Sequence, residues 1–430
     1  MDKLLVQGGV PLHGSVKANG SKNATLPIMA AALLSAEPVI IEGVPDLMDV
    51  RTMAAVLQAL GASVRFDPVD GIMNISAEVL RGNEPPLQLV QQMRASFLVL
   101  GPLLARCGRV RLSLPGGCAI GIRPVDLHLK GLTAMGAHFS MVNGCIEGET
   151  DGLKGARIYL DYPSVGATEN IISAAVLARG TTILENAATE PEIVDLANFL
   201  NSMGALISGA GTTSIRVEGV SRLTGTRYKV IPDRIEAGTL LLAGIITGGE
   251  VIVENVLSDH LKPLLAKLRE TGAEVEELGH SAIRAGRSGL LRAVDLKTLP
   301  YPGFPTDLQP QFMALLATCL GTGVITETVF ENRFRHVEGL SCMGAQIQVD
   351  GRHAIVHGVS ALTGAPVCAS DLRGGAALLL AALGARGQTV ISDPYHLWRG
   401  YYRLVERLQE LGAKVKRVYP EPEQLISTGG

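Results

Sequence analysis

Leu60-Gly61-Ala62 closes an amphipathic stretch of the sequence, and five similar segments close similar stretches further along the chain. They are Met135-Gly136-Ala137, Met203-Gly204-Ala205, Thr271-Gly272-Ala273, Met343-Gly344-Ala345 and Leu411-Gly412-Ala413. Consecutive glycines of this set lie 68 to 75 residues apart. A recurring period indicates a repeated architecture. The unit is too long for a solenoid repeat and suits a small layered α/β module, so we expect six such modules.

Each unit contains helix and strand patterns in the same order. An Ala- and Leu-rich run such as Ile171–Ala178 predicts a buried helix, because its residues are small or apolar on every face. A β-branched run such as Thr182-Ile183-Leu184 predicts a strand, and a second, amphipathic helix such as Ile193–Met203 is expected to be exposed. The glycine that follows is typical of a helix C-cap, since glycine adopts the left-handed conformation there without strain. The sequence therefore predicts an α/β fold.

Two sets of polar residues recur at fixed distances before these glycines. The residues that open the buried helices, 37 to 42 positions earlier, are Lys22, Arg94, Ser164, Arg234, Asp307 and Arg373. The residues that open the second helices, 11 to 13 positions earlier, are Asp49, Arg123, Glu192, Asp259, Arg333 and Arg399. Polar residues are common at helix starts, but basic ones have the wrong sign for a helix N-terminus. We therefore interpret the cations as a site for several negative charges, to which the helix N-termini contribute.

Two residues are candidates for proton transfer. Asp307 follows Pro305-Thr306 before an apolar helix, which a helix N-cap would explain by itself. Asp307 occupies the position in its repeat unit that Lys22 occupies in the first unit. It is therefore one carboxylate among cations, and hence a candidate to accept a proton. Cys118 lies in a Gly-rich segment, residues 115–121, which we expect to form a mobile loop. An ordinary loop cysteine is the alternative, but the nearby Arg123 favours the thiolate, so we predict a reactive thiol.

Composition limits the range of functions. A chain of 430 residues predicts two domains, and three units in each divide it near residue 225. The net charge of −3, without a dense basic tract, argues against a nucleic-acid partner. The sequence contains no apolar stretch of membrane-spanning length and no signal-peptide pattern over residues 1–9, so we expect a cytoplasmic protein. The six cysteines form no CxxC pair and the histidines show no ligand spacing, so we expect neither a metal nor a cofactor.

A set of short motifs runs in order along nearly the whole chain. It comprises Lys22-Asn23, Met93-Arg94-Ala95-Ser96, Pro115-Gly116-Gly117-Cys118-Ala119-Ile120-Gly121, Arg123-Pro124, Ser164-Val165-Gly166-Ala167-Thr168, Pro232-Asp233-Arg234-Ile235-Glu236, Phe304-Pro305-Thr306-Asp307, residues 326–333, Asp371-Leu372-Arg373 and Arg399-Gly400-Tyr401. This set resembles the signature of the enolpyruvyl transferases that act on UDP-N-acetylglucosamine.

The resemblance implies a specific architecture. It is a two-domain inside-out α/β barrel, in which each domain contains three repeated βαβαββ-type units, six in the chain. Residues 22–229 would form the N-terminal barrel domain, which carries the mobile Cys118 loop. Residues 1–21 and 230–430 would form the C-terminal barrel domain, and the active site would lie in the interdomain cleft.

The resemblance also implies a reaction. The enolpyruvyl group of phosphoenolpyruvate is transferred to the 3′-hydroxyl of UDP-N-acetylglucosamine with release of phosphate, the first committed step of peptidoglycan precursor synthesis. Lys22, Arg123 and Arg399 would bind the anionic groups of phosphoenolpyruvate and stabilise the charge that develops on them. Arg94 and Arg373 would complete the positive cleft.

The same resemblance assigns the other site residues. Asp307 would take the proton of the 3′-hydroxyl, and Cys118 would give a proton to C3 of the enolpyruvyl group. Cys118 would also be alkylated by fosfomycin, an epoxide that resembles phosphoenolpyruvate. Asn23 would orient the sugar. The rest of the UDP-sugar site would comprise Arg123, Pro124, Val125, Asp126, Leu127, Ser164, Val165, Gly166 and Val329.

The sequence departs from the family pattern near two of these arginines. Trp398 stands where Asp is usual, Gly374-Gly375 where Ala and Ser are more usual, and Ser21 where Ala is common. The placement of Arg373 and Arg399 is therefore open.

Two alternative functions remain. One is that of 5-enolpyruvylshikimate-3-phosphate synthase, which shares the fold and the first substrate but lacks the Pro-Gly-Gly-Cys-Ala loop. The other is a binding or regulatory protein without turnover. The presence of Lys22, Cys118 and Asp307 together argues against it.

Overall fold

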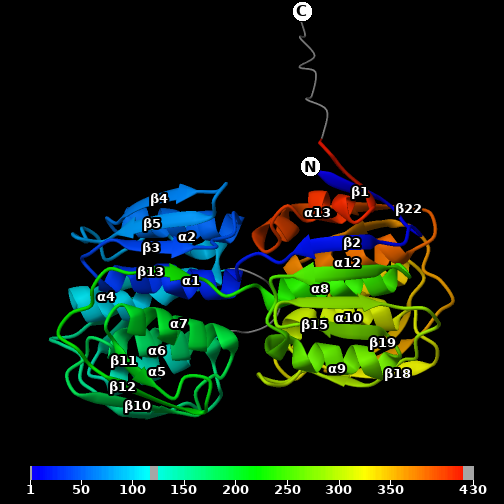
Figure 1. Cartoon of the computed structure of the whole chain (residues 1–430). Coiled ribbons are helices and arrows are strands. Elements are labelled where there is room, and N and C mark those ends of the chain that lie inside the picture. Colours follow the sequence, from blue (N-terminus) through cyan, green and yellow to red (C-terminus); the bar gives the residue numbers. More distant parts are fainter. Residues whose placement is uncertain (1, 117–123, 420–430) are drawn as a thin grey trace, which may run out of the picture.

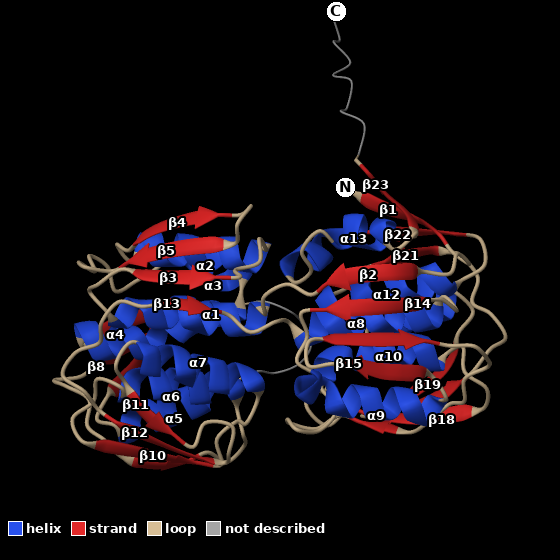
Figure 2. Ribbon diagram, in the orientation of Figure 1, coloured by secondary structure: helices blue, strands red, loops and turns tan. Residues whose placement is uncertain are grey.

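A computed structural model describes residues 2–116 and 124–419. The chain forms two lobes that lie side by side, each containing helices and small sheets (Figures 1 and 2). The described strands form six sheets, five with four strands and one with three. The mixed α/β fold and the six repeated units are as the recurring glycines predicted.

The described helices fall into the two expected groups. The inner group comprises α1 (Lys22–Ala31), η2 (Arg94–Val99) with α4 (Leu100–Cys107), α6 (Val165–Ala175), α8 (Arg234–Ile246), η4 (Thr306–Leu308) with α10 (Gln309–Leu316), and α12 (Leu372–Gly384). The second group comprises α2 (Met48–Ala59), α5 (Asp126–Ala134), α7 (Pro191–Ser202), α9 (Lys262–Thr271), α11 (Val337–Cys342) and α13 (Leu404–Glu410). Shorter helices are η1 (Ala32–Leu34), α3 (Leu87–Gln92), η3 (Ser258–Leu261) and η5 (Pro394–Arg399).

The six sheets have the following strand orders. In one lobe they are β13 (Arg227–Lys229), β3 (Val39–Glu42), β5 (Ile72–Ser76) and β4 (Ser63–Asp67); β6 (Arg109–Ser113), β8 (Cys145–Glu149) and β7 (His138–Val142); and β11 (Leu206–Ser208), β12 (Ser214–Glu218), β10 (Thr181–Glu185) and β9 (Arg157–Tyr159). In the other they are β15 (Glu274–Leu278), β16 (Ala282–Gly286), β14 (Glu250–Glu254) and β2 (His13–Lys17); β17 (Leu296–Lys297), β18 (Thr322–Thr326), β20 (His353–His357) and β19 (Gln346–Asp350); and β21 (Pro366–Cys368), β22 (Gln388–Ser392), β1 (Lys3–Gln7) and β23 (Lys414–Val418).

The glycines that mark the repeats end their helices as predicted. The φ angles of Gly61, Gly136, Gly204, Gly272, Gly344 and Gly412 lie between 89° and 101°. These angles are in the left-handed region, which a residue with a Cβ enters only at a cost in free energy. The recurring glycine is therefore required by the backbone conformation at the end of each second helix.

Two helices differ from the prediction. The run expected to form one helix over residues 95–105 is divided between η2 and α4. The Ser96 hydroxyl there donates to the Val90 carbonyl at 2.9 Å, which ties the start of η2 to the preceding helix. The expectation that α7 is exposed is wrong: most of its residues are buried, because it packs against α1 and α6.

The chain crosses between the lobes twice, and the two crossing segments are paired. Strand β2 precedes α1 but pairs in parallel with β14, while β13 precedes α8 but pairs in parallel with β3. At the crossing the Ser21 N–H donates to the Ile231 carbonyl at 2.7 Å, and the Asp233 N–H donates to the Asn19 carbonyl at 2.8 Å. Helices α1 and α8 both start here, so this pairing places Lys22 and Arg234 at the junction of the lobes.

Each lobe has a hydrophobic core. One cluster of buried side chains draws its members from residues 24–230, and the other from residues 4–18 and 235–415. None of the described helices combines the length and the apolar composition needed to cross a membrane.

Replacing Gly272 with alanine tests the role of the marker glycines. A Cβ at Gly272 would meet no atom within 4 Å, but φ is 90°, so the cost is conformational rather than steric. We expect Gly272→Ala to lower the free energy of unfolding by about 1 kcal/mol, measured by urea denaturation. Gly289 also has open space around it but no left-handed φ, so Gly289→Ala is the matched control and should change stability little. Equal losses in the two variants would contradict this explanation.

Candidate active site

A cavity of about 770 Å³ lies where helix starts from both lobes converge. This volume is within the range of small-molecule sites. Thirteen of the residues that the resemblance assigned to the site line this cavity: Lys22, Asn23, Arg94, Pro124, Asp126, Leu127, Ser164, Val165, Gly166, Asp307, Val329, Arg373 and Arg399. Val125 is half-buried and packs against the core of the N-terminal lobe instead. Cys118 and Arg123 lie outside the described residues.

Asp49 joins two of the predicted cations. It lies in the first turn of α2, where its carboxylate is almost fully buried. Lys22 Nζ is 3.2 Å from Asp49 Oδ2, and Arg399 Nε is 2.8 Å from Asp49 Oδ1. Arg399 ends η5, whose Leu397 belongs to the core of the opposite lobe from α1 and α2. One carboxylate therefore holds together two cations that are far apart in the sequence and come from different lobes.

Asp307 holds a second pair of cations. Arg333 Nη2 is 2.8 Å from Asp307 Oδ1, and Arg373 Nη2 is 2.9 Å from Asp307 Oδ2. Both arginine side chains are almost fully buried. Burial alone would raise the pKa of Asp307, but the charges of Arg373, Arg333 and Lys22 outweigh it and lower the pKa below the ordinary value of a carboxyl group. Asp307 is therefore ionised at neutral pH, as a proton acceptor must be, although the two arginines weaken it as a base.

A second group of carboxylates corrects the expectation of one acid among cations. Glu169, Glu190 and Glu192 also line the cavity, and Arg234 Nε is 3.1 Å from Glu192 Oε1. Burial raises the pKa of Glu169 well above its ordinary value, and the charges of Glu192 and Glu190 add to this effect. Sequence analysis did not select Glu169 or Glu190. The available signal was Glu169 itself, a charged residue within the small-residue helix α6.

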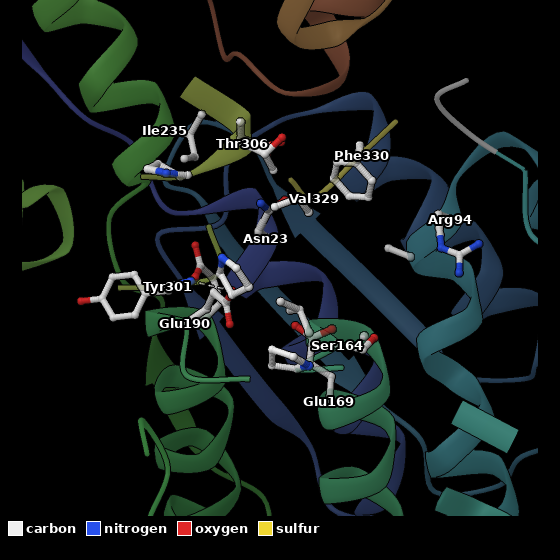
Figure 3. A pocket seen from close by; sticks show the side chains of 18 of the residues that line it. Asn23, Arg94, Ser164, Glu169, Glu190, Ile235, Tyr301, Thr306, Val329 and Phe330 are labelled. Atoms are coloured by element: carbon white, nitrogen blue, oxygen red, sulfur yellow. Dashed lines mark hydrogen bonds between the residues drawn. The ribbon is translucent and has the colours of Figure 1, made fainter. Parts of the chain in front are cut away.

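The opposite charges are grouped at different places around the cavity. Lys22, Arg333, Arg373 and Arg399 surround two carboxylates, whereas Arg234 pairs with Glu192 near two further glutamates. The first group has an excess of positive charge, which suits an anionic ligand. In the view of Figure 3, Arg94 lies on one side of Asn23 and Val329, and Glu190 and Tyr301 lie on the other.

Glu327 holds the segment that carries Val329. Its side chain is buried, and Oε1 accepts hydrogen bonds from the Val329 N–H at 2.8 Å and from the Thr298 hydroxyl at 2.8 Å. Glu327 Oε2 accepts from the Thr306 hydroxyl at 3.0 Å. Because Thr306 precedes Asp307, this carboxylate couples the position of Val329 to that of Asp307.

The start of α6 forms a wall of the cavity. The Ser164 hydroxyl caps the helix by accepting from the Ala167 N–H at 3.4 Å. A Cβ at Gly166 would lie 3.1 Å from His128 Cε1, so a glycine allows the helix start to pack closely on this buried imidazole. On the same lobe, Arg94 Nη2 donates to the Pro124 carbonyl at 3.0 Å, which brings two further predicted residues together.

The described residues contain no group of side chains suited to bind a metal ion. Among residues 2–116 and 124–419, His, Cys, Asp and Glu form no group of three or more that could hold a metal ion.

Comparisons with known proteins identify the family. The model of the EPSP synthase (3-phosphoshikimate 1-carboxyvinyltransferase) family matches residues 6–408. UDP-N-acetylglucosamine 1-carboxyvinyltransferase 2 from Carboxydothermus hydrogenoformans is 58% identical over 419 residues, which cover 97% of this chain and 100% of that protein. The chain belongs to the enolpyruvyl transferase family. UDP-N-acetylglucosamine 1-carboxyvinyltransferase 1 from Caldanaerobacter subterraneus is 53% identical over 416 residues, or 96% of this chain and 99% of that protein.

Solved structures of the enolpyruvyl transferase family have the same fold. The enolpyruvyl transferase NikO from Streptomyces tendae has a TM-score of 0.87 at 27% identity, covering 97% of this chain and 98% of that one. An EPSP synthase from Acinetobacter baumannii has a TM-score of 0.76 at 18% identity, covering 97% and 100%, which is a likeness of fold alone. The higher identities therefore group the chain with the UDP-N-acetylglucosamine 1-carboxyvinyltransferases, as its motifs predicted.

Asp307→Asn tests the charge arrangement with inorganic phosphate as the probe. The substitution removes the charge that neutralises Arg333 and Arg373, so we expect phosphate to bind about tenfold more tightly, measured by calorimetry at low salt. Asp126 lines the same cavity but makes none of the ion pairs found among the described residues. Asp126→Asn is therefore the matched control, with an expected change below about twofold. Equal tightening in both variants would show that net charge, not the Asp307 pairing, controls anion binding.

Proposed function

We propose that the protein transfers the enolpyruvyl group of phosphoenolpyruvate to the 3′-hydroxyl of UDP-N-acetylglucosamine and releases phosphate. This is the first committed step of peptidoglycan precursor synthesis, and we place it in the cytoplasm. The main support is the convergence of Lys22, Arg373 and Arg399 with Asp307 on one cavity, in a chain 58% identical to a protein named for this activity.

Phosphoenolpyruvate binds at the cationic part of the cavity. Its phosphate and carboxylate compete with Asp49 and Asp307 for the guanidinium and ammonium groups that these carboxylates hold. Lys22, Arg399 and Arg123 take the anionic groups, and Arg94 and Arg373 add positive charge around them. These cations also stabilise negative charge that develops in the transition state.

The nucleotide sugar binds between α6, the segment after Pro124 and the loop that contains Val329. Asn23 orients the sugar, and Asp307 takes the proton of its 3′-hydroxyl as the oxygen attacks C2 of phosphoenolpyruvate. Once phosphoenolpyruvate draws Arg373 away, the Asp307 carboxylate is less strongly held and becomes a better base.

Cys118 supplies the other proton. Its thiol protonates C3 as the new C–O bond forms at C2, which gives a tetrahedral ketal. The Cys118 thiolate then takes a proton back from C3, which restores the double bond as the C–O bond to phosphate breaks. The leaving phosphate takes the proton held by Asp307, so both groups return to their starting forms and no external oxidant or reductant is needed.

We further propose that each lobe is an inside-out α/β barrel domain, with residues 22–229 in one and residues 1–21 and 230–430 in the other. The interdomain cleft holds the active site, and closure of the domains over the substrates excludes water. The ion pairs of Asp49 with Arg399 and of Glu192 with Arg234, each between residues assigned to different domains, support a cleft that changes its contacts when anions bind.

A phosphate-release assay tests this function against its alternatives. We expect release only when phosphoenolpyruvate and UDP-N-acetylglucosamine are both present, because the sugar hydroxyl is the nucleophile. Release with shikimate 3-phosphate in place of the nucleotide sugar would indicate the shikimate reaction. Binding of both substrates without release would indicate a regulatory protein and overturn the proposal.

Cys118→Ala tests the thiol assignment. Without the proton donor, turnover near neutral pH should fall by at least about 10²-fold, within the range for general acid catalysis. Cys145→Ala removes a half-buried thiol on β8 and should leave turnover within about twofold of wild type. Fosfomycin should add its mass to the wild type and to Cys145→Ala but not to Cys118→Ala. Equal losses of activity in the two variants would show that the thiol assignment is wrong.

A further inference from the structure

The short helix η5 carries Arg399, and its position decides where this arginine reaches. The helix starts after Asp393, whose φ of 53° is in the left-handed region, and it ends at Arg399 itself. Arg399 then spans the junction to Asp49 on α2. A long side chain is held at one point only if its backbone is fixed, because otherwise ordering it costs conformational entropy.

One face of η5 is fixed by close packing on α12. Leu397 is fully buried, and a Cβ at Gly375 would lie 3.3 Å from Leu397 Cδ2. A Cβ at Gly400 would lie 2.6 Å from Leu372 Cδ2, so the end of η5 approaches α12 as closely as a glycine allows. These two glycines therefore let η5 pack directly against the inner helix.

The next residue, Trp398, fixes η5 from the C-terminal strand β23. The Arg417 guanidinium carbon lies 4.9 Å from the ring centroid of Trp398 and 4.9 Å from that of Tyr419. Arg417 Nε also donates to Asp2 Oδ2 at 3.0 Å. Two aromatic rings and a carboxylate thus orient this guanidinium, and β23 is itself paired with β1 along its full length (Figure 2).

We propose that Trp398 is a positioning residue for Arg399, and that its stacking with Arg417 holds η5 where Arg399 reaches both Asp49 and the bound phosphoenolpyruvate. This inference rests on the proposed function. It assigns to the single tryptophan of the chain a role in binding the first substrate, although the indole is adjacent to Arg399 and not among the residues that line the cavity.

Steady-state kinetics of the phosphate-release reaction test this role. Trp398→Ala should raise the KM for phosphoenolpyruvate about tenfold and leave the KM for UDP-N-acetylglucosamine within about twofold, because only the Arg399 side of the site loses its support. Arg417→Met removes the charge but keeps an unbranched side chain, and should raise the same KM about fivefold. Trp398→Phe keeps an aromatic face, so its KM for phosphoenolpyruvate should lie close to the wild-type value.

Tyr395→Ala provides the matched control. Tyr395 is an exposed aromatic residue on the same helix, so its loss should change neither KM by more than about twofold. The thermal midpoint of each variant shows whether a kinetic change follows only from general destabilisation. The emission of the single tryptophan supplies a second readout: it should change when phosphoenolpyruvate is added to the wild type with UDP-N-acetylglucosamine, and this response should be smaller in Arg417→Met.

Two results would overturn the inference. One is an unchanged KM for phosphoenolpyruvate in both Trp398→Ala and Arg417→Met, and the other is an equal rise in both KM values. If Trp398→Ala does not fold, the comparison of Arg417→Met with Tyr395→Ala decides the question. A wild type that releases no phosphate refutes the proposed function, whereas an active wild type with silent variants refutes only the positioning role.

Discussion

The carboxylates of Asp49 and Asp307 each hold two cations where the lobes meet, and the candidate site depends on this pairing. Unpaired buried charges are costly, so Lys22, Arg333, Arg373 and Arg399 need acidic partners to be kept together. In the reaction proposed above, an incoming anion would offer these cations an alternative partner, and would thereby change both the basicity of Asp307 and the contacts of Asp49 across the junction.

The repeated architecture explains why these groups meet. Each unit starts an inner helix at an equivalent point, and the paired crossing segments near Ser21 and Ile231 bring two such starts together. The N–H groups at these starts are capped by side chains: the Asp233 carboxylate accepts from Ile235 and Glu236, and the Ser21 hydroxyl accepts from Ala24. The repeat thus gathers basic side chains at one junction, whereas an unrepeated fold would need a separate solution for each residue.

The charge distribution around the cavity also gives a ligand a preferred direction. The cationic residues surround Asp49 and Asp307, while Glu192, which pairs with Arg234, lies near Glu169 and Glu190. Burial and the charges of Glu192 and Glu190 raise the pKa of Glu169 well above its ordinary value, which favours its neutral form and lessens the negative charge on this side. A substrate with two anionic groups at one end is therefore favoured in one orientation.

The sequence by itself determined the features that depend on local chemistry. The glycine caps follow from the left-handed φ that each helix end requires, and the equivalent positions of Lys22, Arg94, Asp307 and Arg373 follow from the period of the repeat. Only the tertiary structure decided which charges pair, because Asp49 and Arg399 are brought together by contacts between lobes. It also decided that β2 pairs with β14 and β13 with β3, that α7 is buried and that the pKa of Glu169 is raised, since each depends on neighbours that are distant along the chain. A required backbone conformation or a repeated unit places particular residues at regular intervals in the sequence. Long-range packing and desolvation produce no such regular spacing.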